Sequence, residues 1–510
     1  MSKVFIDGCS LTLDDFVNVA RHGHQVELTK ESKELVLRSR KVVDDLVDEK
    51  KVVYGITTGF GKFSDVIISK DEAKDLQRNL IISHSTGVGN HFSEEVARGI
   101  MLLRANALSK GFSGIRIETL TTLIEMLNKG VYPLIPEKGS LGASGDLAPL
   151  SHMVLVMLGE GEAKFNGQHL TGAEAMEQAG IPTIDLTSKE GLALINGTQV
   201  MTSVGAFTAY DAKQAMKLAD ISAALTLEAL NGITDAYDPR LHMVRPHPGQ
   251  LRTAENLLRI TAESKATTRQ GEIRVQDAYS LRCVPQIHGA SKDALQYVLD
   301  KLDIEMNAVT DNPIIFPEDK MAISGGNFHG QPMALAFDFL GIAIAEIANV
   351  SERRIERLVN PQLSGLPAFL TPHGGLHSGF MIMQYSAASL VSENKVLAHP
   401  ASVDSIPSSA NQEDHVSMGT IGARKAGDIL ENAMNVIAIE LLSSTQAIDF
   451  NDSSKLGKGT KTAYDIVRQE VEKLVEDRVM YKDINKVYAL IRNHSIVKAV
   501  EKEIGCLEIN

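Results

Sequence analysis

Apolar side chains recur every three or four residues over much of the second half of the chain. Between residues 205 and 230 this helical spacing continues until Asn231-Gly232, a pair that commonly ends a helix. The apolar positions include many alanines and face several sides, which predicts a helix packed closely among neighbours. We therefore expect this helix in the centre of a bundle.

Three further stretches share this spacing and predict long helices, at residues 332–360, 378–397 and 418–444. Pro361 and Pro400 follow the first two, and proline cannot continue a helix. The whole pattern predicts a mainly α fold. We expect a long antiparallel central helix bundle at residues 201–510 and a smaller N-terminal mixed region at residues 1–200 that carries active-site loops.

Strand-like pieces are short and look peripheral. In residues 160–170, Phe165-Asn166-Gly167 predicts the turn of a hairpin, because Asn-Gly tolerates the left-handed backbone of a two-residue turn. Polar, glycine-containing loops interrupt the helical regions, and loops on a rigid scaffold are where function tends to lie. These loops are residues 54–62, 139–145, 194–198, 276–282, 324–329 and 411–415.

Composition narrows the class of protein. The chain has 510 residues, enough for two or three domains or for one long helical body. Its formal net charge of -13 argues against a nucleic-acid partner, which would require clustered Lys and Arg to neutralise phosphates. A small-molecule partner fits this composition better.

Cysteine usage and the N-terminal segment favour a cytoplasmic location. Cys9, Cys283 and Cys506 are far apart and odd in number, so they offer neither a disulfide framework nor a Cys-x-x-Cys metal site. Asp7 and Asp14 interrupt any apolar signal core, and no run of about 18 apolar residues could span a bilayer. We expect no membrane partner.

Two stretches approximate known motifs, one for binding nucleotides and one for serine hydrolysis, but their residues do not have the spacing that either motif requires. Residues 55–62 approximate a phosphate-binding loop, but Ile56 stands where its first glycine should be and Phe63 where Ser or Thr should bind magnesium. Residues 142–146 approximate the nucleophile elbow of a serine hydrolase, but the second glycine comes one residue early in a helical context. Neither activity is expected.

Metal binding is also not expected. The histidine pairs His22 and His24, and His399 and His415, lack the i, i+4 spacing with an intervening carboxylate that a zinc-binding helix shows. These histidines are better interpreted as surface or core residues.

The strongest motif is the fifteen-residue stretch at 136–150, which reads PEKGSLGASGDLAPL. Its plainest interpretation is a glycine-rich loop that leads into a helix near Asp146, with Pro149 in the first turn. As a whole, the stretch resembles the cofactor loop of the aromatic amino acid ammonia-lyase family. The resemblance implies that Ala143-Ser144-Gly145 forms 4-methylidene-imidazol-5-one autocatalytically, without an outside cofactor.

Small residues suit this chemistry. For the backbone nitrogen of Gly145 to attack the carbonyl of Ala143, the chain must fold back to near contact, and the missing side chain of Gly145 removes the main obstacle. Loss of the Ser144 hydroxyl then leaves an exposed methylene. That methylene is an electrophile that no ordinary side chain supplies.

Other segments match the same family in order: residues 54–61, Asn196-Gly197, residues 276–282 and residues 325–329. The first resembles the family's mobile loop, in which Tyr54 is the candidate base for the substrate β-proton. Thr57 departs from the asparagine expected in many members, which leaves the detailed contacts of this loop open.

The resemblance also implies roles for residues that bind substrate. Arg282 would hold the substrate carboxylate as a fork, which a planar guanidinium does better than lysine. Asn196, Gln276 and Tyr279 would orient the substrate and the cofactor oxygen, and Phe328 would pack beside the ring. Taken singly, Asn196-Gly197 could be only a turn, Phe328 a core aromatic and Arg282 a member of a surface ion pair.

Two local features resemble the histidine branch of the family: Ser83-His84, and residues 411–415 with Glu413. A buried polar atom of the substrate costs about 1 to 3 kcal/mol if it is left unpaired, so a site with His84 and Glu413 favours imidazole over phenyl. Glu413 could also accept a proton during ammonia release. The acidic residues at 412–415 could alternatively mark a helix N-terminus.

This branch implies elimination of ammonia from L-histidine to give trans-urocanate, the first step of histidine degradation. It also implies a homotetramer whose active sites are assembled from loops of different chains. An aminomutase with the same cofactor is a rival interpretation, which product analysis would separate. A non-catalytic helical scaffold is a second rival, but it would need none of the ordered polar motifs.

Overall fold

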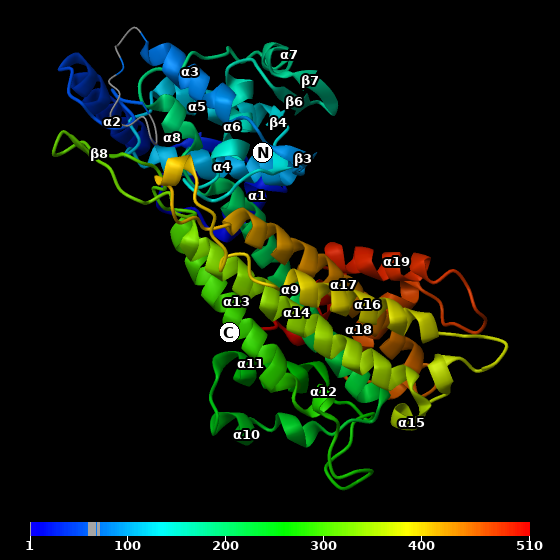
Figure 1. Ribbon diagram of the computed structural model, residues 1–510. Coiled ribbons are helices and arrows are strands. Elements are labelled where there is room, and N and C mark those ends of the chain that lie inside the picture. The colour runs from blue at the N-terminus through cyan, green and yellow to red at the C-terminus, as the bar shows by residue number, and fades with distance from the viewer. Residues whose placement is uncertain (1, 60–67, 69–71, 510) are drawn as a thin grey trace. The chain divides into compact units, whose positions relative to one another are not determined.

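The computed structural model describes residues 2–59, 68 and 72–509 (Figure 1). The chain forms two compact units. Unit 1 comprises Met1–Phe207, Leu299–Phe337 and Pro400–Arg424, and unit 2 comprises Thr208–Val298, Asp338–His399 and Lys425–Asn510. We predicted two contiguous regions, at residues 1–200 and 201–510, whereas each compact unit combines three separate segments of the chain. The predicted regions therefore stay a prediction.

Unit 1 contains all of the short sheets. Its strands are β1 (Lys3–Ile6), β2 (Gln25–Leu28), β3 (Val88–His91), β4 (Tyr132–Pro133), β5 (Pro136–Lys138), β6 (Glu162–Phe165), β7 (Gln168–Thr171), β8 (Ile314–Phe316) and β9 (Met321–Ile323). Strands β1 and β2 pair in parallel, whereas β3–β5, β4–β6–β7 and β8–β9 are antiparallel. No sheet in the described part of the chain exceeds three strands, so the mainly α fold class is confirmed.

The helices that lie wholly in unit 1 before α9 are α1 (Leu13–Ala20), α2 (Lys30–Asp48), α3 (Ala73–His84), α4 (Glu94–Ser109), α5 (Ile117–Lys129), α6 (Leu147–Met157), α7 (Gly172–Gln178) and α8 (Glu190–Ile195). Helix α4 lies in the core and contacts α1, α2 and α5. Every residue from Gly99 to Ser109 is buried, including Arg104. A Cβ at Gly99 would lie 2.3 Å from the Ser203 hydroxyl, so only glycine permits this approach.

The predicted hairpin is confirmed. Strands β6 and β7 pair with Phe165 opposite Gln168, which leaves Asn166 and Gly167 as the two-residue turn. Their φ angles of 50° and 77° are both in the left-handed region, as this kind of turn requires.

The four longest helices are α9 (Gln199–Ala229), α13 (Val284–Glu305), α14 (Gln331–Val359) and α17 (Gly419–Ile448), and most of their residues belong to unit 2. The other helices of unit 2 are α10 (Pro239–Met243), α11 (Pro248–Ile260), α12 (Tyr279–Arg282), α15 (Pro361–Ser364), α16 (Met381–Leu397), α18 (Lys458–Glu470), α19 (Tyr481–Arg492) and α20 (Ser495–Ile504). All four helices predicted from the apolar spacing are therefore present, as α9, α14, α16 and α17. Their antiparallel order stays a prediction.

Buried polar contacts join the long helices within unit 2, where Figure 1 shows them running along one another. Asp220 on α9 accepts from Lys292 on α13 at 2.5 Å and lies 2.9 Å from Nδ1 of His288. On α14, Arg354 forms an ion pair with Glu440 of α17. Burial raises the pKa of Asp220, but Lys292 and His288 outweigh it and the net direction is downward. Such fully buried charges are tolerated because each has a partner.

Helix α14 is the one helix in the described residues that is long and apolar enough to cross a membrane. However, 67% of its most apolar window is buried inside the protein. The core helix of a helical bundle has the same length, apolar composition and burial.

Candidate active site

Backbone geometry at residues 139–145, between β5 and α6, requires glycine. Gly142 and Gly145 have φ angles of 71° and 75°. A Cβ at Gly145 would lie 2.1 Å from the carbonyl oxygen of Gly197, and one at Gly142 would lie 2.2 Å from the Ser417 hydroxyl. The loop is therefore pressed against two other segments, and no larger residue fits at either glycine.

Asp146 anchors the end of this loop, a role that the sequence did not reveal. Its backbone N–H donates to the carbonyl of Gly197 at 2.7 Å, and its carboxylate accepts from the backbone N–H groups of Val200 (3.0 Å) and Met201 (2.9 Å). The Ser140 and Thr420 hydroxyls also donate to it. Burial raises the pKa of Asp146, although these hydrogen bonds act in the opposite direction. The carboxylate thereby caps α9 and ties that helix to the loop.

A pocket of about 250 Å³ lies beside the loop within unit 1. Its lining combines the predicted cofactor tripeptide with both residues predicted to select imidazole. The lining residues are Ser83, His84, Thr86, Gly139, Ser140, Leu141, Ala143, Ser144, Gly145, Leu147, Ala148, Ser408 and Glu413.

Glu413 is hydrogen-bonded directly to the tripeptide. The Ser144 hydroxyl donates to Oε1 of Glu413 at 3.0 Å, and the Ser408 hydroxyl donates to Oε2 at 2.9 Å. Backbone hydrogen bonds between Ser408 and Glu413 hold this segment in a tight turn rather than in the alternative helix N-terminus. The Ser408 hydroxyl thus orients the Glu413 carboxylate toward the Ser144 hydroxyl.

His84 is the last residue of α3 and is half-buried. Its Nδ1 lies 3.1 Å from the Ser83 hydroxyl. Burial lowers the pKa of His84, while its contact with the Leu80 backbone and the charge of Glu413 act to raise it. The net downward direction favours a neutral imidazole at neutral pH, which can both donate and accept hydrogen bonds.

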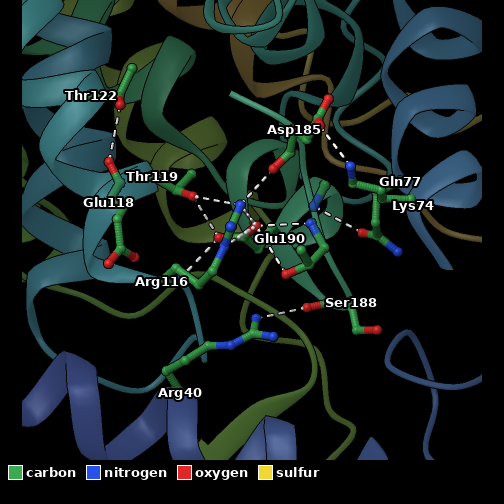
Figure 2. A network of polar contacts seen from close by, with 12 residues as sticks. Arg40, Lys74, Gln77, Arg116, Glu118, Thr119, Thr122, Asp185, Ser188 and Glu190 are labelled. Carbon is green, nitrogen blue, oxygen red and sulfur yellow. Dashed lines mark hydrogen bonds and ion pairs between the residues drawn. The ribbon is translucent and has the colours of Figure 1, made fainter. Parts of the chain in front are cut away.

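Asn196 follows directly after α8, and buried charges hold the start of this helix. Figure 2 shows the Glu190 carboxylate among its donors: Nε of Arg116 at 2.9 Å and the Thr119 hydroxyl at 2.6 Å. At the other end of α8, Nδ2 of Asn196 donates to the carbonyl of Asn312 at 3.1 Å. Its Oδ1 is buried, and no described residue donates a hydrogen bond to it. Asn196 does not line the pocket, but Gly197 beside it contacts the cofactor loop.

Tyr54 is half-buried in a turn that begins the predicted mobile loop. The Thr57 hydroxyl donates to the carbonyl of Lys51 at 2.6 Å, so this departure from the family pattern has a local structural role. Tyr54 does not line the pocket. Phe60 and Gly61 lie outside the described residues.

Phe328 is half-buried and does not line the pocket. Its neighbour His329 stacks on His415 with ring centres 5.8 Å apart, and Nε2 of His329 lies 3.2 Å from the carbonyl of His415. This contact joins the segment of Phe328 to the segment of Glu413.

Gln276, Tyr279 and Arg282 belong to unit 2, on and just before α12. Tyr279 is 69% exposed, and the guanidinium carbon of Arg282 lies 4.6 Å from the centre of its ring. Nε of Arg282 is buried and has no hydrogen-bond partner in the part of the chain that the structure describes. These three residues do not line the pocket of unit 1.

Within the described part of the chain, no group of three or more His, Cys, Asp or Glu side chains could hold a metal ion.

The sequence model of the aromatic amino acid lyase family matches residues 11–469. The chain belongs to this family.

Relatives in the family extend the likeness over the full chain. The histidine ammonia-lyase of Alkaliphilus oremlandii is 69% identical over 504 residues, which cover 99% of each sequence. Among solved structures, the histidine ammonia-lyase of Trypanosoma cruzi is 44% identical with a TM-score of 0.92, and the match covers 98% of this chain and 96% of that one. The tyrosine aminomutase of Streptomyces globisporus is 38% identical with a TM-score of 0.96, covering 99% and 100%.

Family membership identifies the reaction class, because aromatic amino acid lyases break a carbon–nitrogen bond. The fold alone does not separate a lyase from an aminomutase, since both kinds of structure superpose closely on this chain. Sequence identity favours the lyase, since the histidine ammonia-lyase relative is 69% identical to this chain and the tyrosine aminomutase is 38% identical.

Proposed function

We propose that the chain eliminates ammonia from L-histidine to give trans-urocanate, the activity of a histidine ammonia-lyase and the first step of histidine degradation. The observation that carries this proposal is the hydrogen bond from Ser144 to Glu413, in a pocket that His84 also lines. A polar pair in this position suits an imidazole, whose nitrogen atoms need partners when they are buried.

The residues of the loop fit the 4-methylidene-imidazol-5-one group. A ring that joins the backbone of Gly145 to that of Ala143 needs a tight, side-chain-free bend, and Gly145 has the positive φ angle and the close Gly197 contact of such a bend. Once formed from Ala143-Ser144-Gly145, this group supplies an electrophilic methylene carbon.

The remaining chemistry belongs to side chains. His84 and Glu413 bind the imidazole, and Glu413 accepts a proton as ammonia leaves. Tyr54 removes the β-proton as a general base. Phe328 packs beside the ring, while Asn196, Gln276 and Tyr279 orient the substrate, and Arg282 holds the substrate carboxylate through two parallel hydrogen bonds.

We further propose that the protein is a cytoplasmic homotetramer, with neither a nucleic-acid nor a membrane partner, and that another chain supplies Gln276, Tyr279 and Arg282. The exposure of Tyr279 and the unpartnered Nε of Arg282 support this proposal. Large apolar side chains are also exposed on unit 2, including Phe339 and Ile342 of α14. Exposed apolar residues that lie together often mark a protein interface.

Identification of the product tests the function. Purified protein is incubated separately with L-histidine, L-phenylalanine and L-tyrosine, and each product is identified by chromatography and mass spectrometry. We expect urocanate and ammonia from histidine, with much weaker turnover of the other two amino acids. A β-amino acid with the mass of the substrate would instead indicate an aminomutase, the second candidate, which the likeness to tyrosine aminomutase favours.

A further inference from the structure

The Asn196-Gly197 turn packs against the cofactor loop. The carbonyl of Gly197 accepts from the backbone N–H of Asp146 at 2.7 Å, and Gly197 forms a β-bridge with Gly145. Three polar side chains crowd the other side of this turn. A Cβ at Gly197 would lie 2.4 Å from Oε1 of Gln199 and 2.6 Å from both a guanidinium nitrogen of Arg104 and the Thr310 hydroxyl.

Arg104 is the charged centre of this support. It lies on α4, is completely buried, and donates through Nη1 to the carbonyl of Asn196 at 2.8 Å and to Oε1 of Gln199 at 2.9 Å. Gln199 in turn donates to the Thr310 hydroxyl at 2.8 Å. Burial lowers the pKa of Arg104 to about 10, partly offset by Asp311, so the guanidinium is still charged at neutral pH.

The stability of the fold does not explain this buried charge. Among the described residues, Nε and Nη2 of Arg104 have no hydrogen-bond partner, and Asp311 is already paired with the buried ammonium of Lys189 at 2.6 Å. Arg104 and Lys189 are thus two buried cations beside the single carboxylate of Asp311. An apolar side chain in this place would avoid the desolvation cost of the guanidinium, so a role beyond stability is expected for it.

We propose that Arg104 is a positioning residue for formation of the cofactor. By fixing the carbonyl of Asn196 and the side chain of Gln199, it holds the carbonyl of Gly197 against Asp146 and keeps Gly145 bent toward Ala143. The inference rests on the proposed function, namely that Ala143-Ser144-Gly145 cyclises.

The covalent step balances without an oxidant or a co-reactant. A bond forms between the nitrogen of Gly145 and the carbonyl carbon of Ala143. The carbonyl oxygen leaves as water with the amide hydrogens of Gly145 and Ser144, which creates a carbon–nitrogen double bond. The Ser144 hydroxyl then leaves with the α-hydrogen of Ser144 as a second water. The mature peptide is therefore lighter by two water molecules.

The test compares Arg104→Lys and Arg104→Met with the matched control Arg98→Lys. Arg98 lies on the same helix, but its guanidinium donates to the carbonyl of Val19 and to the Tyr132 hydroxyl, away from the turn. A lysine at 104 keeps the charge, but it is a compact single donor without the planar fork of the guanidinium. Three quantities are measured: helicity, the fraction of peptide 139–150 that has lost two waters, and turnover per matured site.

We expect folded Arg104→Lys and Arg104→Met to mature at least about tenfold more slowly than wild type, because a small misplacement of reacting atoms has effects of this size. Turnover per matured site should stay within about threefold, and Arg98→Lys should mature normally. Normal maturation of folded Arg104→Lys would overturn the proposal. Normal maturation with a lower turnover per site would also overturn it, because Arg104 would then act on the reaction itself.

If neither Arg104 variant folds, Thr310→Val provides the test. This nearly isosteric change removes only the hydroxyl that holds Gln199, and we expect a smaller delay of maturation in the same direction. Maturation at the wild-type rate would overturn the proposal. Wild-type protein that never loses two waters would instead contradict the proposed function, so the two failures are distinguishable.

Discussion

The Ser144 hydroxyl and the Glu413 carboxylate, which are 269 residues apart in sequence, are 3.0 Å apart in the structure. The hydroxyl is the group whose loss would create the electrophile, and the carboxylate is the group proposed to accept a proton during ammonia release. This one contact thus joins the group proposed to form the electrophile to the group proposed to act in ammonia release. It also places a negative charge near His84, whose pKa burial nevertheless lowers.

Glu413→Gln should separate proton transfer from binding. The amide preserves the shape and much of the hydrogen bonding but cannot take a proton, and loss of a general base typically costs about 100- to 10,000-fold. We expect kcat to fall by this order, with a modest change in KM. Ser408→Ala, which frees only the second carboxylate oxygen, is the matched control and should have a much smaller effect. A rise in KM alone would show that Glu413 only binds substrate.

His84→Leu should relax selectivity. An apolar side chain cannot pair with an imidazole nitrogen, and an unpaired buried polar atom costs about 1 to 3 kcal/mol, or about 5- to 150-fold in kcat/KM for histidine. Phenylalanine and tyrosine should lose less. The measurement is kcat/KM for the three amino acids in wild type and variant. Unchanged ratios between substrates would remove His84 from imidazole recognition.

Tyr54→Phe keeps the ring but removes the proposed base. We expect kcat to decrease by about 100- to 10,000-fold while binding weakens far less. Tyr132→Phe is a suitable control, because it removes a tyrosine hydroxyl that is bonded to Arg98 and lies outside the pocket lining. If turnover of the Tyr54 variant stays within a few-fold of wild type, this side chain serves only in packing.

Arg282→Lys keeps the positive charge but loses the two-pronged contact with the substrate carboxylate. A hydrogen bond to a charged group contributes about 1.5 to 3 kcal/mol, so we expect kcat/KM for histidine to fall about 10- to 150-fold. The comparison substrate is the decarboxylated analogue, which should be poor with both enzymes. Equal activity of wild type toward histidine and this analogue would argue against a carboxylate contact.

The helices and the hairpin could be predicted because their signals are local. Apolar spacing predicted α14 within one residue of its bounds, and Asn166-Gly167 predicted the turn between β6 and β7. The start of α9 was predicted six residues too late, at 205 instead of 199. The first turn of α9 is held by the carboxylate of Asp146, which is more than fifty residues away in sequence, so the local apolar spacing does not reveal this contact.

The charged residues beneath the site could not be predicted for the same reason. Most partners of Arg104 and Asp146 come from segments that are distant along the chain, so the sequence does not show these contacts. A basic residue inside the strongly apolar stretch of α4 was the one available signal. His84 and Glu413, by contrast, were found through family resemblance, and the structure brings both to the tripeptide.

The most direct test of the account follows urocanate formation from L-histidine by wild type and Ser144→Ala at equal protein concentration. Removal of the hydroxyl should prevent formation of the methylene electrophile and leave the helical fold intact, which circular dichroism checks. We expect rapid urocanate formation by wild type and a collapse of activity in the variant. Near-normal turnover by Ser144→Ala, or no urocanate from wild type, would contradict it.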